Sequence, residues 1–395
     1  MPEVRRTRYA FLYCADQPFL EVGALLRGEI APTSIRDLRA VSILAGREYE
    51  LPREELDVLL ALPADRWIEV QSSEPIDRLA NKGMVLIRDA GGRAAELRHR
   101  DEQLEATHWN VYGALYHSLT RWRDADVGID GVEEEGELGE ASVDLERAVI
   151  ERFGRPPPHF YAVDGRREIR DLPLVRRDGG LYEALARRRT SRTFDEQATL
   201  SEPELATILY EVYGCHGYAP FGEGMAMLHK TSPSGGGLHP IEVYPLIAAV
   251  DGIEPGLYHY RVEAHTLELL APLRAGEARD WAVEFAAGQS YARSAPVVFA
   301  LTARFYRNFW KYRHHQKAYS VLLMDAAHLS QTLYLVCTEL GLGAFVSAAI
   351  NSRNIEERLG LDGFEEGAIA LCGCGARAAG VSDLEPEFLP HRRPP

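Results

Sequence analysis

The sequence predicts an α+β fold built from two domains. Beyond residue 180, segments with helical periodicity and segments with strand periodicity alternate irregularly, which favours α+β over a regular α/β fold. No G-x-G-x-x-G follows a first strand, and this counts against a Rossmann dinucleotide site. A sharp change of composition at residues 124–146, where ten acidic residues stand without a lysine or arginine, separates the two domains.

The N-terminal region predicts a small winged-helix-like module. Two apolar runs within residues 7–30 fit either a hairpin or a strand followed by a helix. Helical patterns follow, and the helix that begins after Ser73 ends at Gly83, which has the position of a left-handed C′ residue. A strand and a hairpin turn complete the module. The expected helices before this one are 35–44 and 54–62, and the expected strand and turn are 84–87 and 89–92.

This module carries too little positive charge for a duplex-binding surface. Between Arg36 and Asp89, eight Lys or Arg stand against eleven Asp or Glu, a net charge of −3. Nucleic-acid binding requires cations that face phosphate, and the whole chain carries a net charge of −15, so we expect no nucleic-acid partner. Capture of a peptide as an added strand needs no net charge and remains open, as does a domain that merely packs against its neighbour.

An aromatic helix and a linker lead into the second domain. Trp109, Tyr112, Tyr116, His117 and Trp122 recur at approximately helical spacing and predict a helix over residues 107–123 whose stripe belongs to a core. The acidic stretch and the following Arg155-Pro156-Pro157-Pro158 read as a solvated and then stiff linker. The resulting organisation is a domain at 1–123, a linker at 124–160 and a second domain at 161–395.

The second domain begins with short helices and continues with strands. A helix is expected over 181–189, and Ser201 with Glu204 forms the capping-box signature of a helix that runs from Leu205 to Val212. Further strands are expected at 241–250, 256–261, 296–302 and 368–373, and further helices at 275–287, 304–311, 321–340 and 356–359.

Several functional classes are disfavoured by composition. The most apolar stretch, residues 321–342, is interrupted by Asp325, His328, Gln331 and Glu339, so it predicts a buried helix and not a membrane span. The N-terminus lacks the apolar core of a signal peptide. Cys372-Gly373-Cys374 alone cannot fill a zinc site, so no metal is expected. Five scattered cysteines fit reduced thiols in a cytoplasmic protein.

A glycine-rich stretch, Thr231-Ser232-Pro233-Ser234-Gly235-Gly236-Gly237-Leu238-His239-Pro240, is the first candidate for function. Three consecutive glycines are unfavourable in a helix or strand, but they let the backbone and its N–H groups approach a ligand closely. Two prolines stiffen the ends, and a strand follows. Taken alone, the stretch fits an ordinary surface turn equally well.

The cluster Arg188-Arg189-Thr190-Ser191-Arg192 is the second candidate. Several guanidinium groups and a hydroxyl within five positions suit a phosphate. The alternative is a basic helix end whose arginines interact with the last carbonyl groups of their own helix.

Together these stretches resemble the nitroreductase superfamily of FMN enzymes, and within it the SagB-type azoline oxidases that mature ribosomally made peptides. The resemblance implies a mixed sheet flanked by helices, FMN as the cofactor and a homodimer. It also implies that winged-helix-like modules in such proteins hold leader peptides. The motifs that carry it are residues 187–194, the glycine-rich stretch, Lys311-Tyr312, Ala318-Tyr319, Asp325-Ala326-Ala327-His328-Leu329 and Gly341-Leu342-Gly343-Ala344.

The resemblance also implies roles for individual residues. The arginine cluster matches the element that grips the FMN phosphate, with Thr190 where serine is usual. Pro233, Ser234 and Gly235 match the loop along the flavin ring. Gly341, Leu342 and Gly343 match a loop that closes the other side through backbone N–H groups, and Arg377 matches a C-terminal basic residue of the phosphate site. The cofactor-binding residues expected in the cluster are Arg188, Arg189, Thr190 and Arg192.

Lys311 and Tyr312 match the catalytic pair of the SagB-type oxidases. Oxidising an azoline to an azole removes a hydride and a proton, and a lysine close to an apolar wall can accept that proton while a tyrosine relays it. The implied substrate is a precursor peptide, with a cyclodehydratase as partner. This chain has Lys317-Ala318-Tyr319-Ser320 where the family tends to have Arg-Ala-Tyr-Arg, which leaves the oxidised ring or bond undefined.

Two other functions remain compatible with the sequence. One is a nitro- or quinone reductase that uses NAD(P)H and does not need the Lys311-Tyr312 pair. The other is a non-catalytic peptide-binding scaffold, which would be colourless and would not take up FMN.

Overall fold

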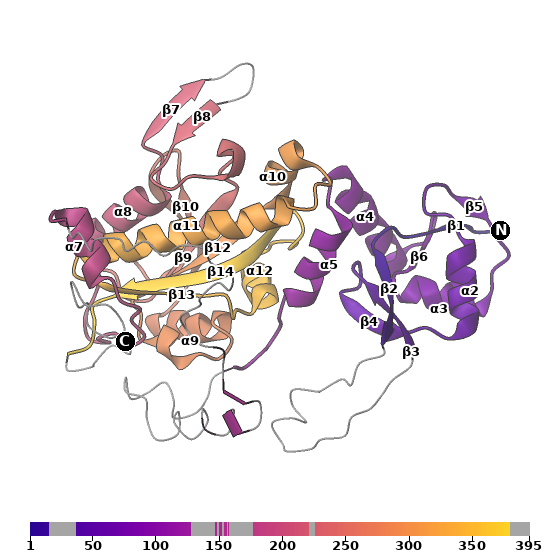
Figure 1. Cartoon of the computed structure of the whole chain (residues 1–395), viewed down its shortest axis with the longest axis horizontal. Coiled ribbons are helices and arrows are strands. Elements are labelled where there is room, and N and C mark those ends of the chain that lie inside the picture. The colour runs from indigo at the N-terminus through magenta and orange to yellow at the C-terminus, as the bar shows by residue number, and fades with distance from the viewer. Residues whose placement is uncertain are drawn as a thin grey trace, which may run out of the picture. The chain divides into compact units, whose positions relative to one another are not determined.

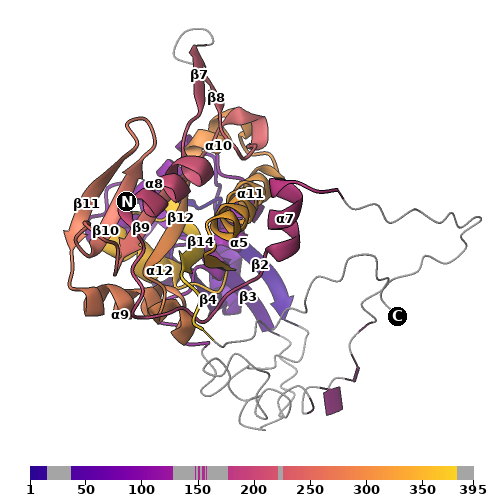
Figure 2. The ribbon, with the colours of Figure 1, turned by 90° about the vertical axis from the view of Figure 1, so that its left-hand side faces the viewer.

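The computed structural model describes residues 1–15, 37–127, 147, 150–151, 154–155, 157, 177–220 and 226–379. The chain forms two compact units, whose elements are labelled in Figure 1 and seen from a second direction in Figure 2. The first unit comprises Met1–Arg121 and Phe305–Ser320, and the second comprises Trp122–Arg304 and Val321–Pro395. Most of the predicted linker and the second apolar run before residue 30 lie outside the described residues.

A six-stranded sheet in the order β11-β10-β9-β12-β14-β13 forms the centre of the second unit. Neighbouring strands run antiparallel, and an isolated parallel bridge from Thr190 to Ala344 of β13 makes the pairing mixed. The central strands β9 and β12 are buried almost throughout. The strands span Ile241–Ile247 (β9), Gly256–Arg261 (β10), Thr266–Pro272 (β11), Val297–Arg304 (β12), Gly343–Ser347 (β13) and Glu366–Gly375 (β14).

Helices cover both faces of this sheet (Figure 1). Side chains of a strand alternate between its faces, so Val298 of β12 joins a core cluster with Phe285 of α9 and Ile355 of α12. The next residue, Phe299, packs on the other face against Tyr213, which follows α8, with ring centroids 5.7 Å apart. The helices are α8 (Glu202–Ile208), α9 (Ala275–Phe285), α11 (Ala318–Glu339) and α12 (Ser352–Leu359).

Local sequence signals located most elements of the second unit. The predicted capping box is confirmed, because the Ser201 hydroxyl accepts from the Glu204 N–H and the Glu204 carboxylate accepts from the Ser201 N–H. Helix α7 (Gly180–Arg187) and strand β10 also lie where they were expected. Four strands were not predicted: β11, β13, and the two strands of a hairpin, β7 (Gly217–Pro220) and β8 (Ala226–His229).

The first unit holds two three-stranded sheets, ordered β5-β1-β6 and β2-β3-β4, with buried Val4, Leu79 and Met84 in its core. The strands span Glu3–Arg6 (β1), Ala10–Ala15 (β2), Asp37–Ser42 (β3), Arg47–Glu50 (β4), Ile68–Glu69 (β5) and Val85–Ile87 (β6). The helices are α2 (Arg53–Ala61), α3 (Glu74–Asn81), α4 (Gly92–Ala106), α5 (Val111–Thr120) and α10 (Phe305–Tyr312).

Two predictions in the first unit are wrong. The expected helix 35–44 is strand β3, since pairing with β2 and β4 decides the conformation of a short apolar run that periodicity leaves ambiguous. The expected hairpin at 84–92 does not form, because β6 pairs with the distant β1 and the chain then begins α4. The C′ role of Gly83 is confirmed by its φ of 69°. The winged-helix-like identity of the module stays a prediction.

Helix α5 is shorter than the predicted helix 107–123, because Asn110 caps it by accepting from the Tyr112 N–H at 3.0 Å. The predicted aromatic stripe divides between core and surface. Trp109 and His117 are buried, and Trp109 packs against Phe305 of α10 with ring centroids 4.7 Å apart. Tyr112, Tyr116 and Trp122 are exposed.

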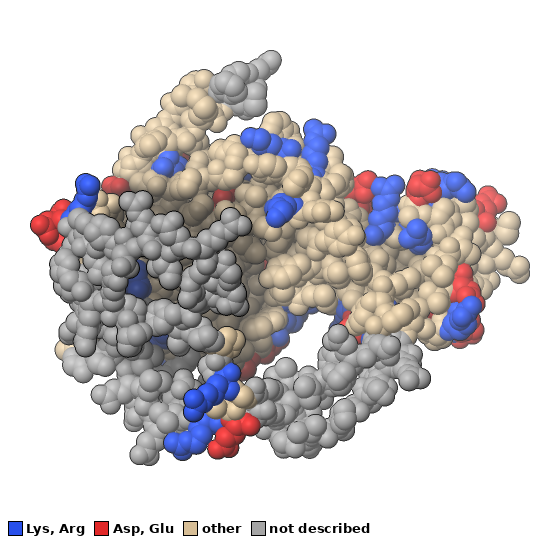
Figure 3. All heavy atoms as spheres, in the orientation of Figure 1, with Lys and Arg blue, Asp and Glu red and all other residues tan. Residues whose placement is uncertain are grey.

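Acidic and basic side chains are interspersed on the face drawn in Figure 3. In the first unit Arg78 alone contacts three carboxylates, those of Glu54, Glu55 and Glu74. Arg39 and Arg88 are paired in the same way with acidic residues of neighbouring strands. These three arginines of the first unit are therefore balanced locally by carboxylates.

One helix among the described residues, α11, is long and apolar enough to cross a membrane by length and composition alone. Half of its most apolar window is buried inside the protein. Asp325 lies buried within it and accepts hydrogen bonds from the glycine-rich stretch. These observations fit the predicted buried helix.

Candidate functional site

The glycine-rich stretch forms a tight turn at Gly235–Gly237, which follows β8 and precedes β9. Gly236 and Gly237 have φ of 65° and 69°, which glycine adopts without a steric penalty. Gly235 is required for a different reason: a Cβ there would lie 2.0 Å from Cγ1 of Val321 in α11. The triplet is thus fixed by backbone conformation at two positions and by contact with α11 at the third.

One face of α11 holds this turn. The Asp325 carboxylate accepts from the Ser234 hydroxyl at 2.5 Å and from the Gly235 N–H at 3.0 Å. One turn further along, His328 Nδ1 lies 3.3 Å from the Pro233 carbonyl oxygen. A second turn on, the hydroxyl groups of Thr332 and Ser232 are 2.6 Å apart. Residues 325, 328 and 332 share a helix face, so one rigid element fixes the turn at three points.

Most N–H groups of the turn are already bonded within the protein. The Gly237 N–H donates to the Ser234 carbonyl oxygen at 3.0 Å, and the His239 N–H donates to the Ser234 hydroxyl oxygen at 2.9 Å. The Gly235 N–H is taken by Asp325. The sequence interpretation expected these groups to point at a ligand. Instead, the turn offers a surface of backbone without side chains, and a Cβ at Gly237 would meet no atom within 4 Å.

The arginine cluster lies beside strand β13. The Thr190 hydroxyl is 3.4 Å from that of Tyr334, and the Arg188 guanidinium lies over the same ring, 5.5 Å from its centroid. Arg192 lies over a different ring, that of Tyr291. Arg189 Nη1 donates to the carbonyl oxygens of Ala186 and Arg188, which is the helix-end alternative. The four predicted residues therefore have three different sets of partners in this structure.

Two other predicted segments meet this cluster. Phe194 bridges to Arg377, and the Ser191 N–H donates to the Ala344 carbonyl oxygen at 2.9 Å. A Cβ on Gly343 would lie 2.5 Å from the Ser191 hydroxyl oxygen and 3.0 Å from Arg377 Cγ. The structure thus brings together residues 188–192, Gly343 and Arg377.

Two details of this site differ from the expectation or were missed. The N–H groups of Gly341 and Leu342 donate to carbonyl oxygens of Thr338 and Cys337 and so end helix α11. The buried Ser191 hydroxyl has no hydrogen-bond partner in the part of the chain that the structure describes. An orphaned buried donor within an arginine-rich segment suits a phosphate-bearing ligand, but no sequence signal distinguishes this serine from its neighbours.

The glycine-rich turn and the arginine cluster contact opposite faces of α11. Asp325 holds the turn, whereas Tyr334 meets Arg188 and Thr190. Nine residues separate the two positions, which places them about 13.5 Å apart along the axis and about 180° around it. The predicted ring-binding and phosphate-binding segments are therefore not brought together in one cleft around this helix.

Lys311 and Tyr312 end helix α10 in the first unit, whereas the other predicted site residues belong to the second unit. Lys311 is exposed and Tyr312 is half-buried. The Lys311 ammonium lies 5.9 Å from the centroid of the Tyr312 ring, so the two side chains are neighbours. Within the described residues, no three His, Cys, Asp or Glu side chains are grouped to hold a metal ion.

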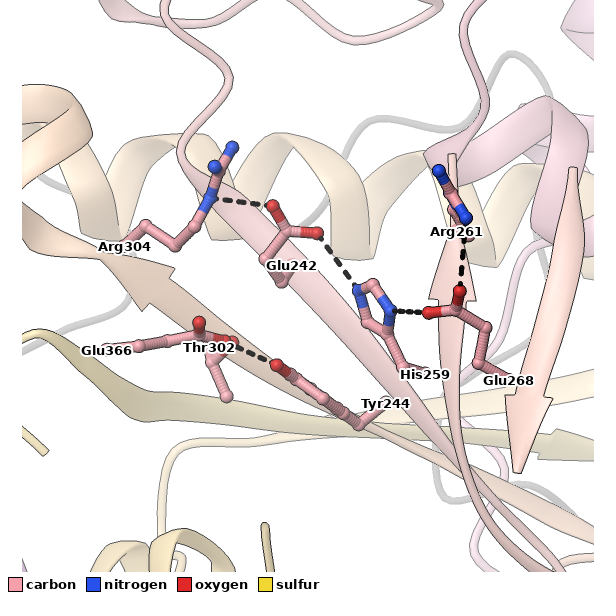
Figure 4. A network of polar contacts seen from close by, with 8 residues as sticks. All are labelled: Glu242, Tyr244, His259, Arg261, Glu268, Thr302, Arg304 and Glu366. Atoms are coloured by element: carbon pink, nitrogen blue, oxygen red, sulfur yellow. Dashed lines mark hydrogen bonds and ion pairs between the residues drawn. The ribbon is translucent and has the colours of Figure 1, made fainter. Parts of the chain in front are cut away.

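A polar network that the sequence interpretation did not single out crosses strands β9, β10 and β12 (Figure 4). Glu242 accepts from Arg304 at 2.7 Å and lies 3.4 Å from His259 Nε2, whose Nδ1 is 2.9 Å from Glu268. Tyr244 and Thr302 both donate to Glu366. Next to the network, burial lowers the pKa of Lys230, the residue that precedes the glycine-rich stretch.

His259 should make stability depend on pH. The hydrogen bond to Glu242 and then that to Glu268 raise the pKa of His259 above its ordinary 6.5, because both ring nitrogens face carboxylates and only imidazolium can donate from both. The stabilisation is complete below pH 6.5 and is lost as pH rises through the folded-state pKa. The free energy of unfolding in urea should be higher for wild type than for His259→Gln, and the difference should be largest at low pH. The exposed His229→Gln should not change the profile, and parallel curves for wild type and His259→Gln would contradict the assignment.

Residues 185–376 match the model of the nitroreductase family. A protein of Methanocaldococcus jannaschii, described by its name as a nitroreductase, is 30% identical over 179 residues, which are 45% of this chain and 83% of that protein. The trifolitoxin-processing protein TfxB of Rhizobium leguminosarum bv. trifolii is 34% identical over 146 residues. That match covers 36% of this chain and 38% of TfxB, so this chain spans little more than a third of that relative.

Among solved structures, a chain of the E. coli microcin synthetase McbBCD complex with truncated pro-MccB17 aligns with a TM-score of 0.45 at 18% identity. The alignment covers 65% of this chain and 89% of the other. The mixed sheet covered by helices on both faces agrees with the family, and the M. jannaschii protein is matched over most of its length at 30% identity. This chain belongs to the nitroreductase family of oxidoreductases.

Proposed function

We propose that this protein is an FMN-dependent dehydrogenase that oxidises a modified ribosomal peptide, taking an azoline to an azole or introducing a related double bond. The proximity of Arg188 and Thr190 to Tyr334, and of Ser191 and Arg377 to Gly343, supports the cofactor assignment. The Lys311-Tyr312 pair and the similarity to a trifolitoxin-processing protein favour a peptide substrate.

The residues at the cluster fit the FMN phosphate. Arg188 and Arg377 would supply charge-assisted hydrogen bonds, and the Thr190 and Ser191 hydroxyls would supply neutral ones. The glycine-rich turn, with Pro233, Ser234 and Gly235, would lie along the flavin ring, and its glycines would let the ring approach the backbone closely. When bound, FMN accepts a hydride at N5. The hydride would leave one carbon of the substrate ring or bond, and Lys311 would accept the proton lost from the carbon next to it. Tyr312 would relay that proton.

A homodimer would reconcile the two halves of the site. The turn and the arginine cluster lie on opposite faces of α11, so in a symmetric dimer the turn of one copy can meet the cluster of the other. Sedimentation of the FMN-loaded protein tests this part of the proposal, and a monomer that retains FMN would contradict it.

We also propose that the module at 1–123, joined by the linker 124–160 to the domain 161–395, captures the leader of the precursor peptide. Its sheet β2-β3-β4 ends in two edges, and an extended peptide can add to a sheet edge without charge complementarity. A cyclodehydratase that makes the azoline would be the partner enzyme, and the cytoplasm the compartment. A binding titration of the whole protein with the precursor peptide tests this, and binding of duplex DNA in its place would contradict it.

A second candidate is a nitro- or quinone reductase that uses NAD(P)H. The specific observation in its favour is the match to the M. jannaschii protein over 83% of its length. NAD(P)H-driven reduction of a nitroarene that does not depend on Lys311 would support it. A non-catalytic scaffold would instead be purified colourless and would fail to take up FMN.

The arginine cluster provides the test of the cofactor assignment. Arg188→Ala/Arg377→Ala should be purified without flavin, since each lost charge-assisted hydrogen bond is worth about 1.5–3 kcal/mol and tenfold in affinity is about 1.4 kcal/mol. Arg189→Ala is the matched control, because its guanidinium already bonds the carbonyl groups of α7. It should stay yellow. Equal FMN content in the double variant and the control would remove the phosphate assignment.

A further inference from the structure

We propose that Asp325 is a positioning residue that sets the shape of the glycine-rich turn and thereby the affinity for the flavin. The inference rests on the proposed function for its ligand, but its structural part concerns this chain alone. Asp325 is 4% exposed, and its two carboxylate oxygens accept from two groups of the turn, the Ser234 hydroxyl and the Gly235 N–H. A buried carboxylate with two such donors is a strong and specific anchor.

The turn needs an anchor because its backbone is unusual at three positions. Gly236, Gly237 and the non-glycine His239 all have positive φ, and for His239 the value of 47° is sterically unfavourable. Residues in such conformations persist only where the surroundings hold them. No regular ladder does so here, since the stretch lies between β8 and β9.

Ser234 connects the anchor to the far end of the turn. Its hydroxyl donates its single proton to Asp325 at 2.5 Å, and its oxygen accepts from the His239 N–H at 2.9 Å. The carboxylate therefore orients the hydroxyl so that its lone pairs face His239. Loss of the carboxylate would free the hydroxyl to rotate and would release the N–H of the strained residue.

Helix α11 gives this anchor its rigidity. Residues next to Asp325 on the helix, Leu322, Ala326 and Leu329, are buried in the second unit. Asp325 lies 91 positions beyond Ser234 in the sequence, so the contact joins the turn to the packed core and not to its own neighbours. Because the Ser234 hydroxyl donates its proton to Asp325, its proposed role toward the flavin is to shape the turn and not to donate a hydrogen bond to the ring.

The first measurement uses the protein without flavin. Hydrogen exchange of the amides in residues 231–240 should be about tenfold faster in Asp325→Asn than in wild type, as expected when a charge-assisted anchor is lost and the turn opens locally. Ser234→Ala should show the same acceleration, and the double variant should exchange no faster than Asp325→Asn, because both changes break one connection. Gln331→Ala, exposed on the same helix, is the control and should exchange like wild type.

The second measurement titrates FMN into the same five proteins. Asp325→Asn and Ser234→Ala should bind FMN about tenfold more weakly, and at saturation the visible circular dichroism of the flavin should change. A purely structural role would lower the unfolding midpoint without altering that spectrum. Exchange and FMN affinity equal to those of Gln331→Ala would overturn the inference. If wild type takes up no FMN at all, the proposed function fails, whereas faster exchange in Asp325→Asn would still establish the anchor.

Discussion

Lys311→Ala should be purified folded and yellow, yet it should oxidise the precursor peptide about 10²–10⁴-fold more slowly than wild type. The lysine lies exposed at the end of α10 and has no assigned contact with FMN, so its loss removes a proton acceptor and not the cofactor. Tyr312→Phe removes only the relaying hydroxyl and should lower the rate as well. Peptide oxidation followed by mass spectrometry measures both, and flavin absorbance confirms that FMN is retained.

Lys317→Ala is the matched control for this prediction. Lys317 is exposed in the same segment of the first unit and carries the same charge, so its removal alters the local field without removing the proposed base. It should leave the rate close to that of wild type. If Lys311→Ala, Tyr312→Phe and Lys317→Ala all oxidise the peptide at the wild-type rate, the catalytic pair is wrong and the reductase becomes the better description.

Signals confined to a few neighbouring residues predicted structure well. Ser201 with Glu204 identified a capping box, and Gly83 identified a helix end, because these conformations are decided within one turn of chain. Strand β10 lies where its run of residues placed it. The fold class followed from the irregular order of such elements.

Features decided by distant partners were not predictable in the same way. Strand β3 was expected to be helical, because its pairing with β2 and β4 is not encoded in its own periodicity. The arginine cluster did not reveal which of its arginines would bond a carbonyl group at the end of α7 and which would face Tyr334. The placement of Asp325 under the turn depends on a contact across 91 positions, which a single sequence does not reveal.

Gly235→Ala should destabilise the protein by steric conflict. The added methyl group would lie 2.0 Å from Val321 Cγ1, far inside contact distance, and overpacking of this kind costs about 1–3 kcal/mol. Because the conflict is with one methyl group, Val321→Ala should relieve it: the Val321 Cβ, which remains, is 3.4 Å away. The free energy of unfolding in urea, measured for wild type, both single variants and the double variant, gives the coupling between the two positions.

Gly237→Ala separates this steric effect from backbone conformation. Its φ of 69° makes any side chain unfavourable by about 1–2 kcal/mol, but the new Cβ would meet no atom within 4 Å. Adding Val321→Ala to Gly237→Ala should therefore restore none of the lost free energy of unfolding. Adding Val321→Ala to Gly235→Ala should restore most of it. Equal responses of the two glycine variants to Val321→Ala would mean that α11 does not press against the turn. The anchoring of the turn by this helix would then lose its steric support.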